Sequence, residues 1–296
     1  MSPRAVERRS SRTAAYTCVT RAALHRERNA LLHCPDDISQ VFLPLAARGL
    51  ISILPLRHFF LNRLAPKGLP EYVLARTHIF DDAFTDALEQ GFPQIVLLGA
   101  GFDTRAVRFA DRNCCGTKVF ELDMPKTQDA KLDIYWRKRV TVKENVFFVP
   151  IDFDTQDLGG TLRSQGYKDG VKTLFLWEGV TMYLTPEAVH GTLDFIRSSA
   201  AQGSILVFDY VRAEVLRGEG NLYGDRVASK TVADTGEAWT FGLEEGEVAQ
   251  LLADHGFELR AHYTPEDMER LYFTDGDGRV LRRVNGTHCI VSAALE

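Results

Sequence analysis

The sequence lacks the patterns that mark a disulfide framework or a metal centre. Its five cysteines form no C-x-x-C pair, and an odd number cannot all be joined in disulfides within one chain. Its eight histidines form no H-E-x-x-H motif and no cluster with cysteine. We therefore expect no metal ion, and idle thiols of this kind are typical of the reducing cytoplasm.

The sequence also lacks a basic surplus and a long hydrophobic run. It has 35 Lys and Arg against 40 Asp and Glu, and this balance argues against a nucleic-acid surface. The most apolar stretch, Val41 to Leu61, is interrupted by two prolines, two arginines and a histidine. A membrane helix needs about 20 largely apolar residues. We therefore expect no nucleic-acid or membrane partner, and we interpret this stretch as a buried or pocket-lining helix.

Short apolar runs alternate with helical segments after about residue 91. The runs are rich in β-branched and aromatic residues, as in strands that are covered on both faces. This alternation predicts an α/β fold with a doubly wound, mostly parallel, seven-stranded sheet. The expected strands are residues 95–98, 118–122, 146–149, 173–177, 204–208, 258–263 and 287–293, with crossover helices such as 125–139 and 186–199.

We expect a single domain over residues 1–296. Its N-terminal third is predicted to be helical, with residues 1–70 forming a helical cap. Residues 211–240 are glycine-rich and charged, and they break the alternation after the fifth strand. A long insert at such a place is more often a lid over a site than a separate domain.

The first strand runs into Gly99-Ala100-Gly101, a turn that lets a ligand lie against the backbone. A dinucleotide-binding turn would have a third glycine where this chain has Thr104. Asp103 would repel a phosphate, but it suits a cofactor that carries an ammonium and a sulfonium. The turn therefore favours S-adenosyl-L-methionine over NAD, and a nicotinamide dehydrogenase is the disfavoured alternative.

Acidic residues also follow the next two strands. Glu121 lies where a carboxylate can bind the two ribose hydroxyls of a nucleotide, and Asp123 competes for the same role. After the third strand, Asp152 can accept a hydrogen bond from an adenine amine, and Phe153 can pack near the ring. Spacing alone does not rank Glu121 against Asp123.

Glu178 and Gly179 follow the fourth strand. In doubly wound sheets, ligands bind outside the carboxyl ends of the strands. Four consecutive strand ends that carry glycine or an acid therefore indicate one binding site.

Five blocks of the sequence, taken in order, resemble the leucine carboxyl methyltransferase family of class I methyltransferases. That family includes an enzyme that methylates the C-terminal carboxylate of a protein phosphatase, and many bacterial polyketide-type O-methyltransferases. The G-A-G-F-D-T-R and E-G-V-T-M-Y-L blocks are the most specific. The five blocks are residues 75–77, 98–105, 120–125, 152–153 and 178–184.

The resemblance implies a Rossmann-like fold and a role for each matched residue. Arg76 would bind the methionine carboxylate of S-adenosyl-L-methionine through its guanidinium. Glu178, the catalytic candidate, would lie near the methionine amine and the transferring methyl group. The implied cofactor-binding set is Arg76, Gly99, Ala100, Gly101, Asp103, Glu121, Leu122, Asp123, Asp152, Phe153, Glu178 and Gly179.

The resemblance points to an oxygen acceptor, and we favour a carboxylate of a small molecule or peptide. A carboxylate is already ionised at pH 7, whereas a phenol needs a general base, and no His or Lys stands out in the strand-end motifs. The alternatives are a hydroxyl of a polyketide-like metabolite and a protein that binds the cofactor without catalysis. Tyr183 and the cap arginines Arg21, Arg212, Arg217 and Arg226 are the substrate-binding candidates.

Overall fold

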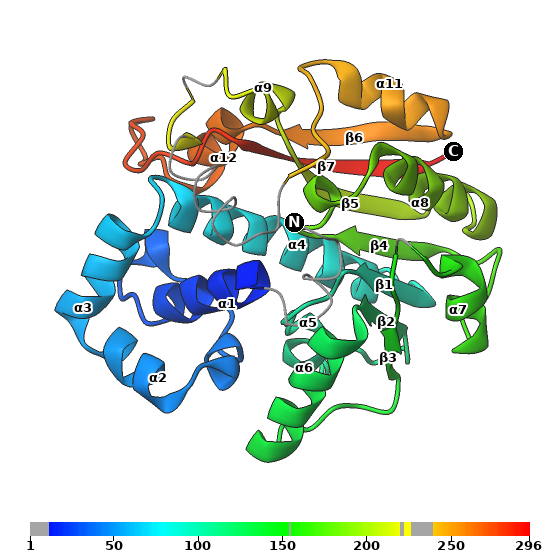
Figure 1. Cartoon of the computed structure of the whole chain (residues 1–296), viewed down its shortest axis with the longest axis horizontal. Coiled ribbons are helices and arrows are strands. Elements are labelled where there is room, and N and C mark those ends of the chain that lie inside the picture. Colours follow the sequence, from blue (N-terminus) through cyan, green and yellow to red (C-terminus); the bar gives the residue numbers. More distant parts are fainter. Residues whose placement is uncertain (1–11, 154, 220–221, 226–238) are drawn as a thin grey trace.

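The computed structural model describes residues 12–153, 155–219, 222–225 and 239–296 (Figure 1). Helices make up the first third of the chain, as the sequence predicts. Pro70 lies in the first turn of the long helix α4, where its missing N–H has no helical partner to lose. The elements are α1 (Arg12–His25), η2 (Ala30–Leu32), η3 (Ser39–Phe42), α2 (Leu45–Ser52), α3 (Leu54–Phe59), the π-helical turn η4 (Phe60–Leu64) and α4 (Leu69–Glu89).

A seven-stranded sheet forms the centre of the molecule, in the order β3-β2-β1-β4-β5-β7-β6. Neighbouring strands from β3 to β5 run parallel, while β7 runs antiparallel to both β5 and β6. The doubly wound α/β fold predicted from the sequence is thus confirmed. The strands are β1 (Gln94–Leu98), β2 (Lys118–Asp123), β3 (Val146–Pro150), β4 (Thr173–Trp177), β5 (Ile205–Val211), β6 (Phe257–Tyr263) and β7 (His288–Leu295).

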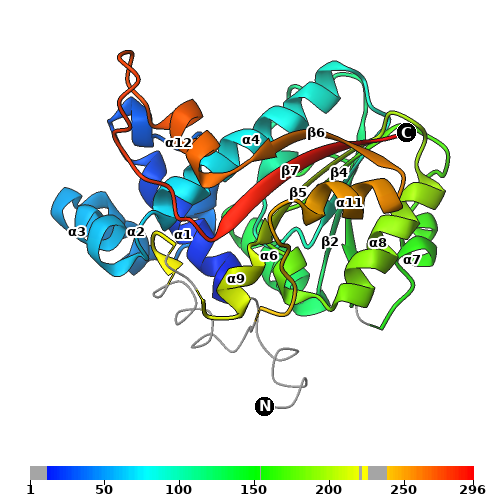
Figure 2. The same ribbon diagram turned by 90° about the horizontal axis from the view of Figure 1, so that it is seen from above.

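Helices cover both faces of this sheet (Figure 2). The crossover helix α8 begins where the Thr185 hydroxyl caps the Ala188 N–H, with Pro186 in the first turn. Arg139 takes a left-handed conformation directly after α6 and ends it. The remaining helices are α5 (Arg105–Arg108), α6 (Pro125–Lys138), α7 (Leu158–Ser164), α8 (Pro186–Ser199), α9 (Ala213–Leu216), α11 (Glu247–Asp254) and α12 (Pro265–Tyr272), with the 3-10 turn η5 (Thr181–Tyr183).

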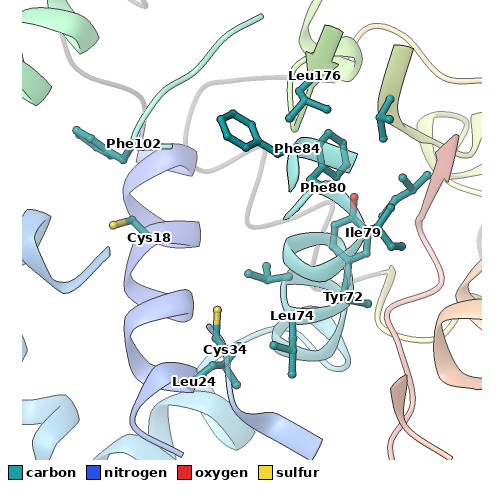
Figure 3. Close-up of a cluster of buried hydrophobic side chains, with 14 of the residues drawn as sticks. Cys18, Leu24, Cys34, Tyr72, Leu74, Ile79, Phe80, Phe84, Phe102 and Leu176 are labelled. Carbon is teal, nitrogen blue, oxygen red and sulfur yellow. The ribbon is translucent and has the colours of Figure 1, made fainter. Parts of the chain in front are cut away.

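Successive strand residues alternate between two hydrophobic cores, one on each face of the sheet. In β1, Ile95 and Leu97 face the core shared with α1 and α4, whereas Val96 and Leu98 face the core shared with α7, α8 and α11. Figure 3 shows the first core, in which α1 with Cys18 and Leu24 lies beside α4 with Tyr72, Leu74, Phe80 and Phe84. The first helix of the N-terminal segment is thus packed into the main core.

Two expectations about the ends of the chain need correction. The stretch from Val41 to Leu61 was expected to be buried or pocket-lining, but only part of it is. Leu43, Ile51 and Leu61 are buried, whereas several of its leucines are largely exposed. From the sequence, no helix was assigned between the last two strands, and the structure has α12 there, with a Thr264–Asp267 capping box. Among the described helices, none is both long and apolar enough to cross a bilayer.

Candidate functional site

The site is built on the edge of the sheet where the parallel strands end. At the end of β1, Gly99 and Gly101 both have positive φ angles, 69° and 48°. A Cβ atom on Gly99 would lie 2.3 Å from Val180 Cγ2, so glycine is required there. The Ala100 N–H donates to the Leu122 carbonyl at 2.7 Å. The turn is therefore fixed against β2.

Asp123 is the acid that borders this turn. Its Oδ2 accepts from the Gly101 N–H at 2.6 Å and its Oδ1 from the Met124 N–H at 2.7 Å. Burial raises the pKa of this carboxyl, although both N–H groups favour its charged form. The side chain is partly exposed at the carboxyl edge of the sheet, where it can accept further hydrogen bonds.

Glu121 does not reach the site in this structure. Its side chain is 1% exposed, and its Oε2 lies 2.5 Å from Nζ of Lys131, which belongs to α6. Burial raises the pKa of Glu121, and the ammonium of Lys131 opposes this rise. The expectation that Glu121 shares the ribose role is thus not supported. Glu121 and Asp123 are two residues apart on β2 and share a face, but Glu121 lies before the strand end, where Lys131 holds its carboxylate. Asp123 is the better candidate.

Asp152 and Phe153 lie directly after β3, next to Asp123. The Ile151 N–H donates to the Asp123 carbonyl at 2.9 Å, so the two strand ends are joined. Asp152 and Phe153 are both partly buried, and Phe153 packs against the second core. The structure thus brings both adenine candidates to the same edge as the glycine turn.

Arg105, fully buried at the start of α5, holds the carboxylate of Asp103. The Asp103 carboxylate accepts from the Arg105 backbone N–H at 2.7 Å and also contacts the Arg105 guanidinium. Burial alone would raise the pKa of Asp103, but the Arg105 guanidinium lowers it to about 2. From the sequence, Asp103 was expected to suit the positive charges of the cofactor. Instead it is one member of a larger network.

Glu178, which directly follows β4, forms ion pairs with two guanidiniums. Its Oε2 lies 2.7 Å from Arg105 Nη1 and its Oε1 3.1 Å from Arg76 Nε. Although burial would raise the pKa of Glu178, these two guanidiniums lower it overall. Glu178 is therefore held as an anion and is a poor proton acceptor.

Asp209, on β5, is a site residue that the sequence analysis missed. Its Oδ2 accepts from Arg76 Nη1 at 2.9 Å and from the Tyr72 hydroxyl at 2.6 Å, while its Oδ1 accepts from the Gly179 N–H at 2.5 Å. The same strand-end rule that singled out Glu178 could have found Asp209, but the predicted fifth strand stopped one residue short of it. Asp209 thus positions Arg76 and Gly179 together.

These ion pairs form one continuous buried network that reaches from α1 to β5. Four guanidiniums meet five carboxylates, which leaves one excess negative charge when all are ionised. A buried excess of this sign is complementary to a ligand with a net positive charge. In addition, Arg105 Nη2 is buried without a hydrogen-bond partner among the described residues. The members are Arg21, Arg76, Arg105, Arg108, Asp36, Asp81, Asp103, Glu178 and Asp209.

S-adenosyl-L-methionine fits this edge by charge and by shape. Its ammonium, sulfonium and carboxylate sum to one positive charge, which matches the excess of the network. The turn at Gly99 offers bare backbone where any side chain would clash with Val180. Asp123 supplies an acceptor where a ribose would need one.

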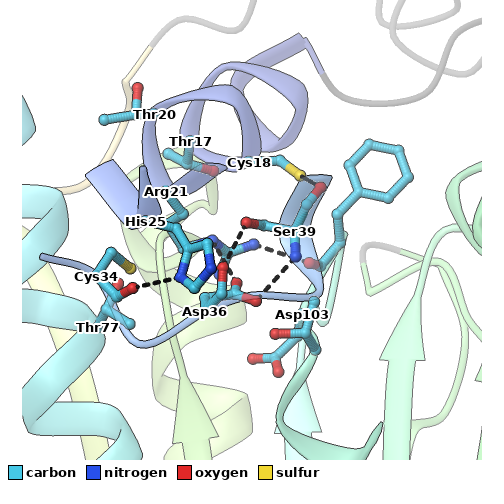
Figure 4. Close-up of polar contacts among 12 residues, drawn as sticks. Thr17, Cys18, Thr20, Arg21, His25, Cys34, Asp36, Ser39, Thr77 and Asp103 are labelled. Carbon is cyan, nitrogen blue, oxygen red and sulfur yellow. Dashed lines mark hydrogen bonds and ion pairs between the residues drawn. The ribbon is translucent and has the colours of Figure 1, made fainter. Parts of the chain in front are cut away.

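The cap arginines were expected to bind the substrate, but those that the structure describes are already paired with other groups of the protein. Arg21 is 5% exposed, lies 3.2 Å from Asp36 and donates to the Phe102 carbonyl at 2.8 Å (Figure 4). It therefore ties α1 to the cofactor turn. Arg212 pairs with Glu214 at 2.8 Å, and Arg217 pairs with two glutamates. Arg226 lies outside the described residues.

Aromatic side chains close the site between α4, η5 and β7. His288, paired in register with Val211 at this edge, stacks on Tyr72 and meets Trp239 edge-on. Tyr183 packs in the same small cluster as Trp239, and its hydroxyl lies 3.5 Å from Thr13 of α1. The described residues contain no group of three or more His, Cys, Asp or Glu that could hold a metal ion.

A family model for leucine carboxyl methyltransferases matches residues 14–197. The chain belongs to this family. A relative from Mycolicibacterium smegmatis is 30% identical over 261 residues, which cover 86% of this chain and 84% of the relative. A relative from Bacillus subtilis is 30% identical over 202 residues, or 68% of this chain and 66% of its own. Both carry the designation of an S-adenosyl-L-methionine-dependent methyltransferase.

The fold of this leucine carboxyl methyltransferase family member also matches a solved structure. A DUF574 family protein from Streptomyces avermitilis superposes with a TM-score of 0.61 over 97% of this chain and 98% of that chain, at 12% identity. The relatives and the family match show that the chain is a methyltransferase that uses S-adenosyl-L-methionine. The predicted family, cofactor and enzyme class are thus confirmed.

Proposed function

We propose that this methyltransferase transfers a methyl group to a carboxylate oxygen of a small molecule or peptide, which gives a methyl ester. One observation carries the proposal: the carboxylates of the buried network at the site are already paired with arginines. Asp103 contacts Arg105, Glu178 contacts two arginines, and Asp209 contacts Arg76. A group held in this way has little tendency to take a proton from an acceptor.

His288 does not supply a strong base either. Burial lowers the pKa of His288 to about 4, so the ring is neutral at pH 7 but binds a proton weakly. Its Nδ1 lies 2.6 Å from Thr287 Oγ1, and Tyr72 stacks on its face. Removing the proton of a phenol, with a pKa of about 10, would be steeply uphill for such a ring. An acceptor that arrives ionised avoids this step.

The cofactor would be held by the residues that the fold gathers at this edge. When bound, S-adenosyl-L-methionine supplies a methyl group on a positively charged sulfur. Asp123 would accept from its ribose, while Asp152 and Phe153 would hold its adenine. Arg76 can donate to its carboxylate through Nη2, which takes part in neither of the ion pairs that Arg76 makes. The Glu178 carboxylate would face its ammonium and so orient it.

The acceptor would lie between η5, β7 and the first turn of α1. Trp239 Nε1 is buried there without a hydrogen-bond partner among the described residues, so it can donate to an acceptor oxygen. Tyr183 and His288 flank this tryptophan. We assign the orienting of the acceptor to Trp239 and to the Tyr183 ring. The buried Arg21 instead holds α1 in place.

The product distinguishes this proposal from transfer to a hydroxyl. A panel of carboxylic acids and phenols is incubated with the enzyme and methyl-labelled cofactor, and the labelled product is treated with mild alkali. A methyl ester releases labelled methanol, whereas a methyl ether does not. We expect volatile label from carboxylic acids only. Label that resists alkali would assign the enzyme to hydroxyl methylation.

A further inference from the structure

The outer surface of the N-terminal segment presents an apolar ridge. Its side chains come from α2, α3 and η4, and they point away from the core. Leu45 is 75% exposed, Leu64 62% and Phe59 54%. Isolated exposed apolar side chains are normal, but a group of this size on three consecutive short helices is typical of an interaction surface. The apolar ridge consists of Leu45, Leu50, Ile53, Leu54, Leu56, Phe59 and Leu64.

The segment that carries the apolar ridge contains basic residues and no acidic ones. No acidic residue occurs between Asp37 and Glu71, although the chain as a whole has more acids than bases. Arg63 and Lys67 follow the ridge and are exposed. Arg282, from the loop before β7, reaches the same end, with its Nη1 3.4 Å from Asn62 Oδ1, but this Nη1 also lies 3.5 Å from Glu71 Oε1. Apolar side chains beside cations are typical of helices that lie in the interface of an anionic membrane.

The shape and charge of the ridge favour a lipid surface over a second copy of the chain. α2 and α3 lie at the outer end of the molecule in both views, where they can meet a flat surface (Figures 1 and 2). In a symmetric dimer across the ridge, both sides of the interface would carry Arg63 and Lys67, and like charges would repel. An anionic bilayer has no such conflict.

We propose that the apolar ridge binds the surface of anionic phospholipid membranes. Its leucines and Phe59 enter the boundary between headgroups and acyl chains, while Arg63 and Lys67 meet lipid phosphates. The sequence led us to expect no membrane partner because no run could span a bilayer. The ridge would lie in the surface of the bilayer instead. This assignment is independent of the methyl acceptor.

Vesicle co-sedimentation of the full-length chain tests the proposal. Vesicles of pure phosphatidylcholine are compared with vesicles of equal parts phosphatidylcholine and phosphatidylglycerol. The test variant combines Leu50→Ser, Leu54→Ser and Phe59→Ser, three side chains that are at least half exposed and so contribute little to the core. The matched control combines Leu132→Ser and Trp136→Ser, which are exposed on α6. Thermal melts confirm that both variants are folded.

We expect the wild-type chain and the control to bind the anionic vesicles, and the ridge variant to bind at least about tenfold more weakly. Arg63→Ala should weaken binding by on the order of fivefold, in proportion to one lost cation. Equal binding of the ridge variant and the wild type would overturn the proposal. The absence of vesicle binding by the wild type would also overturn the proposal. If, in that case, the ridge variant converts a dimer to a monomer, the ridge is a dimer interface.

Discussion

Replacing Arg105 with methionine is expected to destabilise the protein by about 3–5 kcal/mol, the range for breaking a buried ion pair from one side. Arg105 is fully buried and contacts Asp81, Asp103 and Glu178. Methionine keeps much of the volume of the side chain but leaves three carboxylates without their shared cation. Urea unfolding at pH 7 measures the change. Arg163→Met, which removes an exposed partner of Asp169, is the control and should leave the urea midpoint unchanged.

The destabilisation by Arg105→Met should shrink as the pH falls. In the wild type the pKa of Asp103 is lowered to about 2, so the stability that this group contributes is present above its ordinary pKa of about 4 and is lost only in stronger acid. Without Arg105, burial dominates and raises the pKa of the same carboxyl. The variant then binds protons more readily when folded, and its deficit at pH 5 should be smaller than at pH 7. A deficit that is the same at both values would contradict the assignment of Arg105 as the shared counter-ion.

Asp123→Ala is expected to weaken cofactor binding by about 1.5–3 kcal/mol, or roughly ten- to a hundredfold, as for the loss of charge-assisted hydrogen bonds. Asp123 stands against the glycine turn, with its Oδ2 on the Gly101 N–H, and is partly exposed at the site edge. Calorimetric titration with S-adenosyl-L-homocysteine gives the affinity directly. The variant should stay folded because this side chain lies at the end of its strand.

Glu121→Gln is the matched control for Asp123→Ala. Both acids belong to β2, but Glu121 is buried and paired with Lys131 of α6. We expect Glu121→Gln to lower the thermal midpoint while it leaves the affinity for S-adenosyl-L-homocysteine within about twofold, since the removed charge lies outside the site. A large loss of affinity in Glu121→Gln with none in Asp123→Ala would reverse the two assignments.

The sequence predicted the strands well because their residues are apolar throughout, as strands covered on both faces require. All seven expected strands appear, and the expected helix 186–199 matches α8 at both ends. The strand-end rule then located Gly99, Asp123, Asp152 and Glu178 at one edge. These features are local, so they can be seen in one sequence.

The predictions that failed concern side chains whose partners come from distant parts of the sequence. Nothing in the sequence shows that Glu121 forms an ion pair with Lys131. Nor does it show that Arg21 contacts Asp36 and donates to the Phe102 carbonyl. Pattern alone also cannot tell an apolar segment that enters the core from one that stays on the surface. The stretch from Val41 to Leu61 does both: Leu43, Ile51 and Leu61 are buried, whereas the leucines of the apolar ridge are exposed.

The pH dependence of methyl transfer tests the central claim, that the acceptor arrives already ionised, most directly. Between pH 6 and pH 9 we expect a nearly constant kcat with a carboxylic acid acceptor, since Asp103 (pKa about 2) and His288 (pKa about 4) titrate below this range. Burial raises the pKa of Glu121 to about 7, within the range of the profile. The profile is therefore repeated with Glu121→Gln, which removes any effect of Glu121 titration on kcat. A constant kcat in both proteins is the predicted result. A kcat that rises about tenfold per pH unit, as the deprotonation of a phenol requires, would contradict the account.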